Sequence, residues 1–408
     1  MENKLNITRR TVTIASLTAI FVITSILAVL SLFMRQSPDD EIEGIELSEV
    51  IVSEIDVILT ENSNNDFDMS SIDSSETFVD SIVSDMSDAS PEGDGFGDSF
   101  AHGWIINEFG YTYVYNGCGY EQFNYKTTAL NRYISSNNEF AKVVPDDVRI
   151  FNILVPVSST FADIPREIYT SDSFFNQSQS AFVSTVSEYN NERIIDLSIV
   201  SQIEQQYDNG EPVFFRTDKN WTSLGAYTAY RAFCDSAELD GYSLDSFELK
   251  NVGEFLGAFY NATKLDQMSH NPDEFFCYST LPTVKTSLTI YDNGRVYTEY
   301  KLCNNKVGAN NAYDIYFGRT AGRYEVSTNV DGGALLIVGD SSSYALVPYL
   351  ASHYGIIEII DPRNVDCGLE ELISKREYSD CILMCYTTNA VNGEFVPSLN
   401  KFIGVENE

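Results

Sequence analysis

Gly339-Asp340-Ser341 is a tripeptide whose residue types and position suit nucleophilic chemistry. It directly follows the apolar run ALLIV and precedes SSYALVPYLASHYG, whose apolar spacing predicts a helix. A serine at the carboxyl end of a strand faces the crevice where open α/β sheets bind ligands, and free N–H groups in the first helical turn stabilise an oxyanion. These are the needs of a serine that transfers acyl groups. The alternative is that Asp340 or Ser341 only caps the helix after a tight turn at Gly339.

A second polar cluster, Arg216–Tyr227 (RTDKNWTSLGAY), lies where a predicted strand meets a predicted helix. With five further strings it resembles the DHHW family of bacterial envelope proteins, over most of the chain from about Arg149 to the C-terminus. Those strings are ILVP at Ile153–Pro156, FLGAFY at Phe255–Tyr260, YDIYFG at Tyr313–Gly318, GDS at Gly339–Ser341 and IDPR at Ile360–Arg363. That family is similar to SGNH-like proteins that O-acetylate alginate and other envelope polysaccharides, where the motif is Asp-x-His-Trp.

The resemblance implies roles for the motif residues. Ser341 matches the nucleophile, Asp218 the aspartate that orients the base, and Trp221 the tryptophan of the motif. Asn220 falls on the catalytic histidine, and an amide has no basic nitrogen to accept the serine proton. Serine without a base is a weak nucleophile, so the resemblance implies an impaired catalytic site. The residues expected to line its crevice are Gly339, Asp340, Arg216, Lys219 and Trp221.

Other groups could replace the missing base only if they reach Ser341. His102 lies beside an acidic segment and His270 in a polar loop, whereas His353 follows Ser341 by 12 residues. If one helix joins Ser341 to His353, the two are about 18 Å apart along its axis, beyond hydrogen-bond reach. Lys219 is the remaining candidate, since a desolvated lysine can act as a base, but its motif position predicts that it points away from the serine.

Three functions are compatible with these residues. The first is an envelope-bound pseudoenzyme whose crevice binds a carbohydrate or a partner protein, and we favour it. The second is an active O-acetyltransferase or acetylesterase on cell-envelope polysaccharide that uses Ser341 with another base. The third is a tethered scaffold in an envelope assembly. A proton acceptor beside Ser341 would favour the second, and a crevice filled by side chains would favour the third.

The N-terminal region predicts a membrane anchor. Residues 11–33 carry no charge and are long enough to cross a hydrocarbon core of about 30 Å. Basic residues precede this span and none follows Arg35 until Lys126, so the positive-inside rule places residues 1–10 in the cytoplasm and the rest outside. A cleaved signal peptide is the alternative, but the run exceeds the usual length and no clear cleavage site follows it.

Residues 34–102 predict a disordered acidic linker. Between Gln36 and Phe100 there are 19 acidic residues and no basic one, and self-repulsion keeps such a segment extended. The chain as a whole has 25 Lys and Arg against 60 Asp and Glu, for a net charge of -35, which argues against a nucleic-acid partner. The seven cysteines show no CxxC pair or zinc-site spacing, so we expect no metal, and the sequence indicates no cofactor.

The folded domain is expected at 103–408 and to be α/β: a mostly parallel, SGNH-hydrolase-like sheet flanked by helices. Runs that predict buried strands are Arg149–Val157, Arg193–Leu197, Glu211–Arg216, Gly333–Val338, Ile356–Ile360 and Cys381–Tyr386. Residues 242–330 predict a β-rich insert with a hairpin turn at Asp292-Asn293-Gly294. Thr222 or Ser223 is expected to cap the helix after the second cluster. Cys381 and Cys385 are expected to be buried as small hydrophobes.

Overall fold

The computed structural model describes residues 103–107, 110–162, 177–299, 302–303 and 313–405, all within one compact unit that spans Phe96–Glu408. The predicted span at 11–33 and the predicted linker at 34–102 both lie outside the described residues. Within the described residues, no helix is long and apolar enough to cross a membrane.

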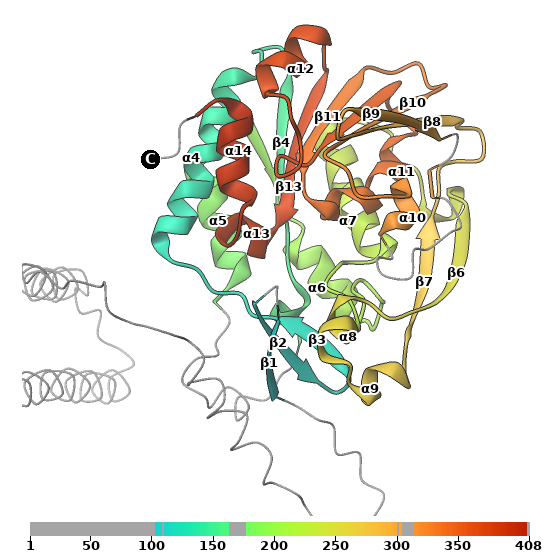
Figure 1. Ribbon diagram of the computed structural model, residues 1–408. Coiled ribbons are helices and arrows are strands. Elements are labelled where there is room, and N and C mark those ends of the chain that lie inside the picture. The colour runs from blue at the N-terminus through green and yellow to red at the C-terminus, as the bar shows by residue number, and fades with distance from the viewer. Residues whose placement is uncertain (1–102, 108–109, 163–176, 300–301, 304–312, 406–408) are drawn as a thin grey trace, which may run out of the picture. The chain divides into compact units, whose positions relative to one another are not determined.

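A central sheet of eight strands organises the domain (Figure 1). In spatial order the strands are β5 (Ile194–Leu197), β4 (Arg149–Val155), β13 (Asp380–Tyr386), β11 (Ala334–Gly339), β12 (Ile356–Ile360), β10 (Arg323–Thr328), β8 (Thr286–Asp292) and β9 (Arg295–Glu299). The first five strands are parallel, and the last three are antiparallel to their neighbours. The fold is therefore α/β with a mixed, mostly parallel sheet.

The inner parallel strands are buried because helices cover both faces of the sheet, whereas β5, at the edge, has only two of its four residues buried, so the buried strand expected there is only partly buried. All seven residues of β13 are buried, and so are six of the seven in β4, as their continuous apolar runs predicted. One group of helices comprises α4 (Thr127–Val143), α5 (Gln179–Tyr189), α12 (Leu369–Lys375), α13 (Thr387–Val391) and α14 (Phe395–Ile403). The other comprises α6 (Val200–Asp208), α7 (Ser223–Ala237), α10 (Asp314–Phe317) and α11 (Val347–Leu350). Figure 1 shows α4, α5, α13 and α14 to one side of α7, α10 and α11.

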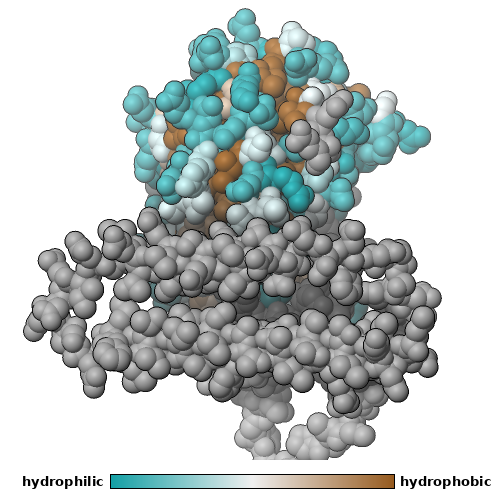
Figure 2. All heavy atoms as spheres, turned by 90° about the vertical axis from the view of Figure 1, so that its left-hand side faces the viewer, coloured by the Kyte–Doolittle hydropathy of each residue, from teal (hydrophilic) through white to brown (hydrophobic). Residues whose placement is uncertain are grey.

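The outer surface beside α4 and α14 is mainly polar. Figure 2 views the domain from that side, where hydrophobic atoms form narrow streaks between hydrophilic ones. The apolar side of α14 is turned inward, with Leu399 and Phe402 both buried.

The predicted β-rich insert is divided between two sheets. β8, β9 and β10 extend the central sheet, whereas β6 (Leu249–Phe255) and β7 (Asp273–Tyr278) form a separate pair. The strands β8 and β9 turn through Asn293-Gly294, whose positive φ angles of 50° and 74° suit the predicted two-residue hairpin. Between β6 and β7 lie the short helices α8 (Ala258–Thr263) and α9 (Asp266–Ser269), and the 3₁₀ turn η3 (Leu244–Ser246) precedes β6.

A small antiparallel sheet near the start of the domain was not predicted. It contains β1 (Gly103–Asn107), β2 (Gly110–Tyr115) and β3 (Cys118–Glu121). The strand β3 contacts α8 and the 3₁₀ turn η1 (Ser158–Thr160), which follows β4. This small sheet therefore lies at the carboxyl-end side of the central strands, where α/β proteins carry their sites (Figure 1).

Candidate active site

Ser341 follows the carboxyl end of β11, where the tripeptide predicted it. The buried Asp340 shapes this turn: its Oδ1 accepts from the Ser342 backbone N–H at 2.9 Å and from the Ser342 hydroxyl at 2.5 Å. Gly339 is required by a close approach, because a Cβ there would lie 2.5 Å from the Met384 carbonyl oxygen of β13. Asp340 thus caps the turn, as one of the two interpretations predicted. It also places Ser341 at the edge of the sheet.

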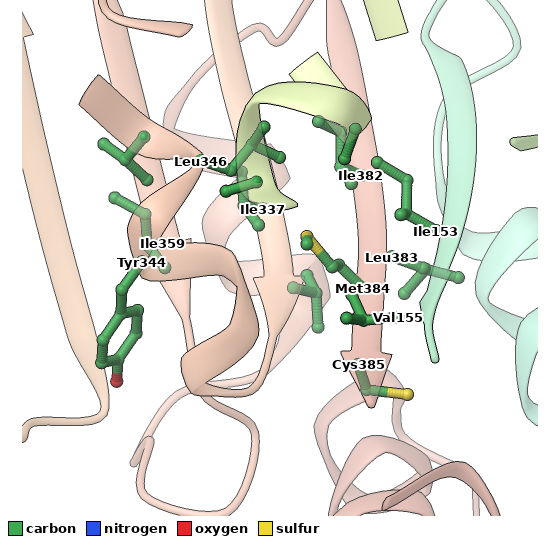
Figure 3. Packing of buried hydrophobic residues seen from close by; sticks show 14 of the residues in the cluster. Ile153, Val155, Ile337, Tyr344, Leu346, Ile359, Ile382, Leu383, Met384 and Cys385 are labelled. Carbon is green, nitrogen blue, oxygen red and sulfur yellow. The ribbon is translucent and has the colours of Figure 1, made fainter. Parts of the chain in front are cut away.

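The segment after Ser341 is not the single helix that was predicted. It forms the 3₁₀ helix η4 (Ser341–Ala345) and then the short α11, with Pro348 in the first turn of α11. Proline has no N–H for a continuous helical ladder, which accounts for the interruption. Figure 3 shows Tyr344 and Leu346 among the packed side chains of the central strands. The turn that carries Ser341 is therefore held rigidly on the core.

Fewer N–H groups are available for an oxyanion than expected. Asp340 accepts the backbone N–H of Ser342 through its carboxylate and that of Ser343 through its carbonyl, at 2.9 and 3.2 Å. Ser341 is only partly buried, and no hydrogen bond of its hydroxyl is found among the described residues. The Ser341 hydroxyl is thus accessible to a ligand, but the backbone N–H groups of Ser342 and Ser343 already donate to Asp340.

The second cluster is a tight loop and not the end of a strand. The predicted strand Glu211–Arg216 is wrong: only an isolated bridge between Phe214 and Trp221 forms there. The loop closes on itself through Thr222 N–H to the Val213 carbonyl at 2.9 Å. These local bonds occupy backbone groups that a sheet neighbour would otherwise use. Thr222 then caps α7 as predicted, and its Oγ1 accepts from Gly225 N–H at 3.3 Å.

Asn220 occupies the position of a base but is held like a structural amide. Its Nδ2 donates to Asp218 Oδ1 at 2.7 Å, and its backbone N–H donates to the same oxygen at 2.9 Å. Its Oδ1 accepts from the Tyr386 hydroxyl at 3.2 Å. Both ends of the amide are therefore engaged by protein groups, and neither end offers a proton acceptor of useful basicity.

Asp218 is fixed by a neighbouring backbone as well as by Asn220. Its Oδ2 accepts from Ala258 N–H at 2.8 Å. A Cβ at Gly257 would lie 2.2 Å from the Asp218 Cβ, so the glycine of FLGAFY permits this approach. Burial raises the pKa of the Asp218 carboxyl, while the bonds from Ala258 and Asn220 oppose that rise. The Asp218 carboxylate is thus held in place by hydrogen bonds to both of its oxygens.

Trp221 joins the two motifs across 121 positions of sequence. Its indole Nε1 donates to the Ser342 carbonyl at 3.0 Å, and its backbone N–H donates to the Tyr386 hydroxyl at 3.0 Å. The Tyr313 hydroxyl, from the YDIYFG string, donates to the Trp221 carbonyl. Because Ser342 adjoins Ser341, these bonds bring the loop of the second cluster beside the nucleophile position.

Arg216 and Lys219 differ in what they contact. Arg216 faces β7: its Nε lies 3.4 Å from Asp273 Oδ1, and its Nη2 donates to the Pro272 carbonyl at 2.7 Å. Lys219 interacts electrostatically with Asp218 and with Glu121 of β3. Arg216 therefore anchors the loop to β7, whereas Lys219 is a cation beside the carboxyl groups of Asp218 and Glu121.

Glu121 was missed by the sequence analysis because it lies about 100 positions before the motif. The Gly119 N–H of the same strand donates to the Arg216 carbonyl at 2.8 Å, which sets β3 against the loop. Burial raises the pKa of the Glu121 carboxyl, the Lys219 ammonium lowers it, and the Asp218 and Asp340 carboxylates raise it. No sequence pattern near Glu121 indicates that β3 packs against this loop.

The histidines lie elsewhere. His353 is half-buried, and its Nε2 lies 2.9 Å from the Tyr230 hydroxyl and 3.7 Å from the Cys234 sulfur. His270 is exposed at the end of α9, as expected. His102 lies outside the described residues.

Comparisons with known proteins found similar solved structures. A crystal structure of a DHHW family protein from Eubacterium siraeum is 21% identical, with a TM-score of 0.64 over 75% of this chain and 98% of that chain. Bacillus cereus PatB1 with a sulfonyl adduct is 14% identical, with a TM-score of 0.56 over 70% and 96% of the respective chains. The O-acetyltransferase domain of Pseudomonas putida AlgJ is 14% identical, with a TM-score of 0.37 over 74% of this chain and 99% of that chain. No curated protein sequence matches the chain.

The fold is α/β with a mixed, mostly parallel sheet, and the joined motifs lie at the carboxyl ends of its strands. The family model described as DHHW protein matches residues 26–360, which is more than half of the chain. The chain belongs to the DHHW family.

Proposed function

We propose that this protein is a membrane-anchored, extracytoplasmic domain of the bacterial cell envelope that binds a carbohydrate or a partner protein and is catalytically impaired. The observation that carries the impairment is the double engagement of Asn220, between Asp218 and Tyr386. In a working triad this position holds an imidazole that bonds the aspartate on one side and the serine on the other. The Asn220 amide reproduces the bond to the aspartate, but it cannot accept a proton from the serine.

The location rests on the uncharged run at 11–33 and on the basic residues before it. The acidic linker at 34–102 would then hold the domain away from the membrane surface. Binding is supported by the turn at Ser341, whose supporting bonds are complete although Asn220 stands at the base position. The resemblance to proteins that modify envelope polysaccharides supports a carbohydrate as the partner.

A second candidate function is an active O-acetyltransferase or acetylesterase on envelope polysaccharide. One specific observation favours it: Glu121 is a carboxyl of raised pKa in the group that includes Asp218, Lys219 and Asp340. A carboxylate of raised basicity suits general-base work near neutral pH. In this case Glu121 would be the first carboxylate to test as the base for Ser341. A tethered scaffold without a ligand remains the third candidate.

The test is hydrolysis of p-nitrophenyl acetate by the full chain, compared with its Ser341→Ala and Asn220→His variants. We expect the parent and Ser341→Ala to be equally slow. We expect Asn220→His to exceed both by at least about tenfold, since a triad base typically contributes several orders of magnitude. The double variant Asn220→His/Ser341→Ala should lose the gain.

Each result separates the candidates. Parent activity that disappears in Ser341→Ala would overturn the impairment, and Glu121→Gln would then show whether that carboxylate is the base. If all variants are silent, the site lacks more than one group, and the scaffold gains support. The Ser341→Ala variant is a suitable control because no hydrogen bond of this hydroxyl supports the described fold.

A further inference from the structure

Two buried thiols lie side by side beneath the start of α7. Cys277 is on the buried face of β7, and Cys303 follows β9 in sequence. Their sulfurs lie 3.6 and 3.7 Å from one shared atom, the carbonyl oxygen of Tyr278. The two side chains are also within hydrogen-bonding range of each other. Both residues are almost completely buried.

The other five cysteines are arranged differently. Cys381 and Cys385 are four residues apart on one strand, so their Cα atoms are separated by about 13 Å and cannot be bridged. Cys234 contacts His353, whereas Cys118 and Cys367 are half-buried. Within the described residues, no other pair of cysteines shares a hydrogen-bond acceptor.

The pair lies in a network that leads to the candidate site. The Cys303 N–H donates to the Tyr316 carbonyl at 3.2 Å, and the Tyr316 hydroxyl lies 2.8 Å from the Ser223 hydroxyl. Ser223 is the first residue of α7 and follows the loop that holds Asp218 and Trp221. At its other end, β7 carries Asp273, which receives the backbone N–H groups of Arg216 and Thr217. A link between the two thiols would fasten β7 behind the loop.

We propose that Cys277 and Cys303 form a structural disulfide when the chain folds in an oxidising environment. One thiolate attacks a small-molecule disulfide such as oxidised glutathione, which releases one glutathione thiol and leaves a mixed disulfide. The second cysteine then displaces the other glutathione. In sum, two S–H bonds are replaced by one S–S bond, and two electrons and two protons pass to the glutathione pair. The proposal does not depend on whether Ser341 is catalytic.

The bond is expected to form during folding and not afterwards. Burial raises the pKa of the Cys277 thiol well above its ordinary value, so the reactive thiolate is scarce in the folded chain. Burial also denies access to an oxidant. An extracytoplasmic location, as proposed above, would supply the oxidising conditions while β7 and the segment of Cys303 come together.

The test is to refold the full chain from denaturant in a buffer of reduced and oxidised glutathione. Free thiols are then alkylated under denaturing conditions, and the digested chain is mapped by mass spectrometry without reduction. We expect one dominant linked peptide pair that joins Cys277 to Cys303, with a loss of about 2 Da relative to the reduced chain, corresponding to two hydrogens. Cys381→Ser should keep this link, and both Cys277→Ala and Cys303→Ala should lose it.

A parallel sample tests the timing. The folded, reduced chain placed in the same buffer without denaturant should keep both thiols alkylatable over the refolding period. Two fully alkylated thiols after refolding, or links from either residue to a different cysteine, would overturn the proposed pair. Rapid bridging in the folded sample would overturn the requirement for folding. The linkage is read from peptides of the parent, so the result stands even if an alanine variant folds poorly.

Discussion

Asn220 donates its side-chain N–H to Asp218 over 2.7 Å, and this bond preserves the acid-to-base contact of a triad without the base. The same carboxylate oxygen also receives the Asn220 backbone N–H. The contact therefore helps to hold the loop, which explains how the local geometry persists without an imidazole. A negative charge at position 220 would face the Asp218 carboxylate.

Asn220→Asp places a second carboxylate against Asp218 and should destabilise the fold by about 1 to 3 kcal/mol at pH 7. The repulsion raises the pKa of one carboxyl in the folded state. The stability that depends on its protonated form is present below the unfolded pKa near 4 and is lost as pH rises through the folded value. Urea unfolding at pH 4, 5.5 and 7 should thus show a deficit that grows with pH. Asn131→Asp, at an exposed position of α4, is the matched control. A deficit independent of pH would contradict the carboxylate contact.

Trp221→Phe removes the indole N–H that reaches the Ser342 carbonyl and leaves that buried carbonyl without this donor. The expected loss is about 1 to 3 kcal/mol of unfolding free energy, increased by the volume lost in the core. Chemical denaturation measures it. Tyr189→Phe alters an aromatic side chain that is 61% exposed and should change stability by less than about 0.5 kcal/mol. Equal stability of the two variants would mean that the bond between the motifs contributes little.

Asp273→Ala should be the more damaging of two neighbouring substitutions on β7. The Asp273 carboxylate accepts from Thr217 at 2.6 and 2.8 Å and from the Arg216 backbone at 2.9 Å, so its removal leaves several donors unpaired beneath the loop. We expect a loss of about 3 to 5 kcal/mol in thermal or urea unfolding. Glu274→Ala, on the exposed face of the same strand, should cost less than about 0.5 kcal/mol. Similar losses for both would refute an anchoring role for Asp273.

Glu121→Gln should raise the melting temperature at pH 8 and change it little near pH 4. Burial and neighbouring carboxylates raise the folded pKa of Glu121, against the effect of Lys219. Its contribution to stability is therefore present below the unfolded pKa of about 4.3 and is lost as pH rises through the folded value. The amide removes that loss. Calorimetry over this range, with the exposed Glu370→Gln as control, measures the difference. A variant that is less stable than the parent at pH 8 would show that the charged Glu121 is favourably paired.

The sequence by itself determined the local elements and showed that the base position of the motif lacks a basic side chain. The apolar runs of β4, β11, β12 and β13 predicted buried parallel strands, since strands covered on both faces need no polar alternation. The turn at Asn293-Gly294 and the cap at Thr222 follow from backbone preferences of single residues. The absence of a basic nitrogen at Asn220 also follows from residue type alone. For these features the information lies within a few neighbouring positions.

Only the tertiary structure decided which distant groups share the site. Trp221 meets Ser342, Tyr386 meets Asn220, and Glu121 joins the acidic group through β3. The strand expected at Glu211–Arg216 did not form because the loop closes on itself, and the helix expected after Ser341 is broken at Leu346, just before Pro348. Such outcomes depend on which hydrogen-bond partners the whole fold offers to each backbone group. Periodicity and motif spacing describe neighbours along the chain, whereas this site is made by contacts across it.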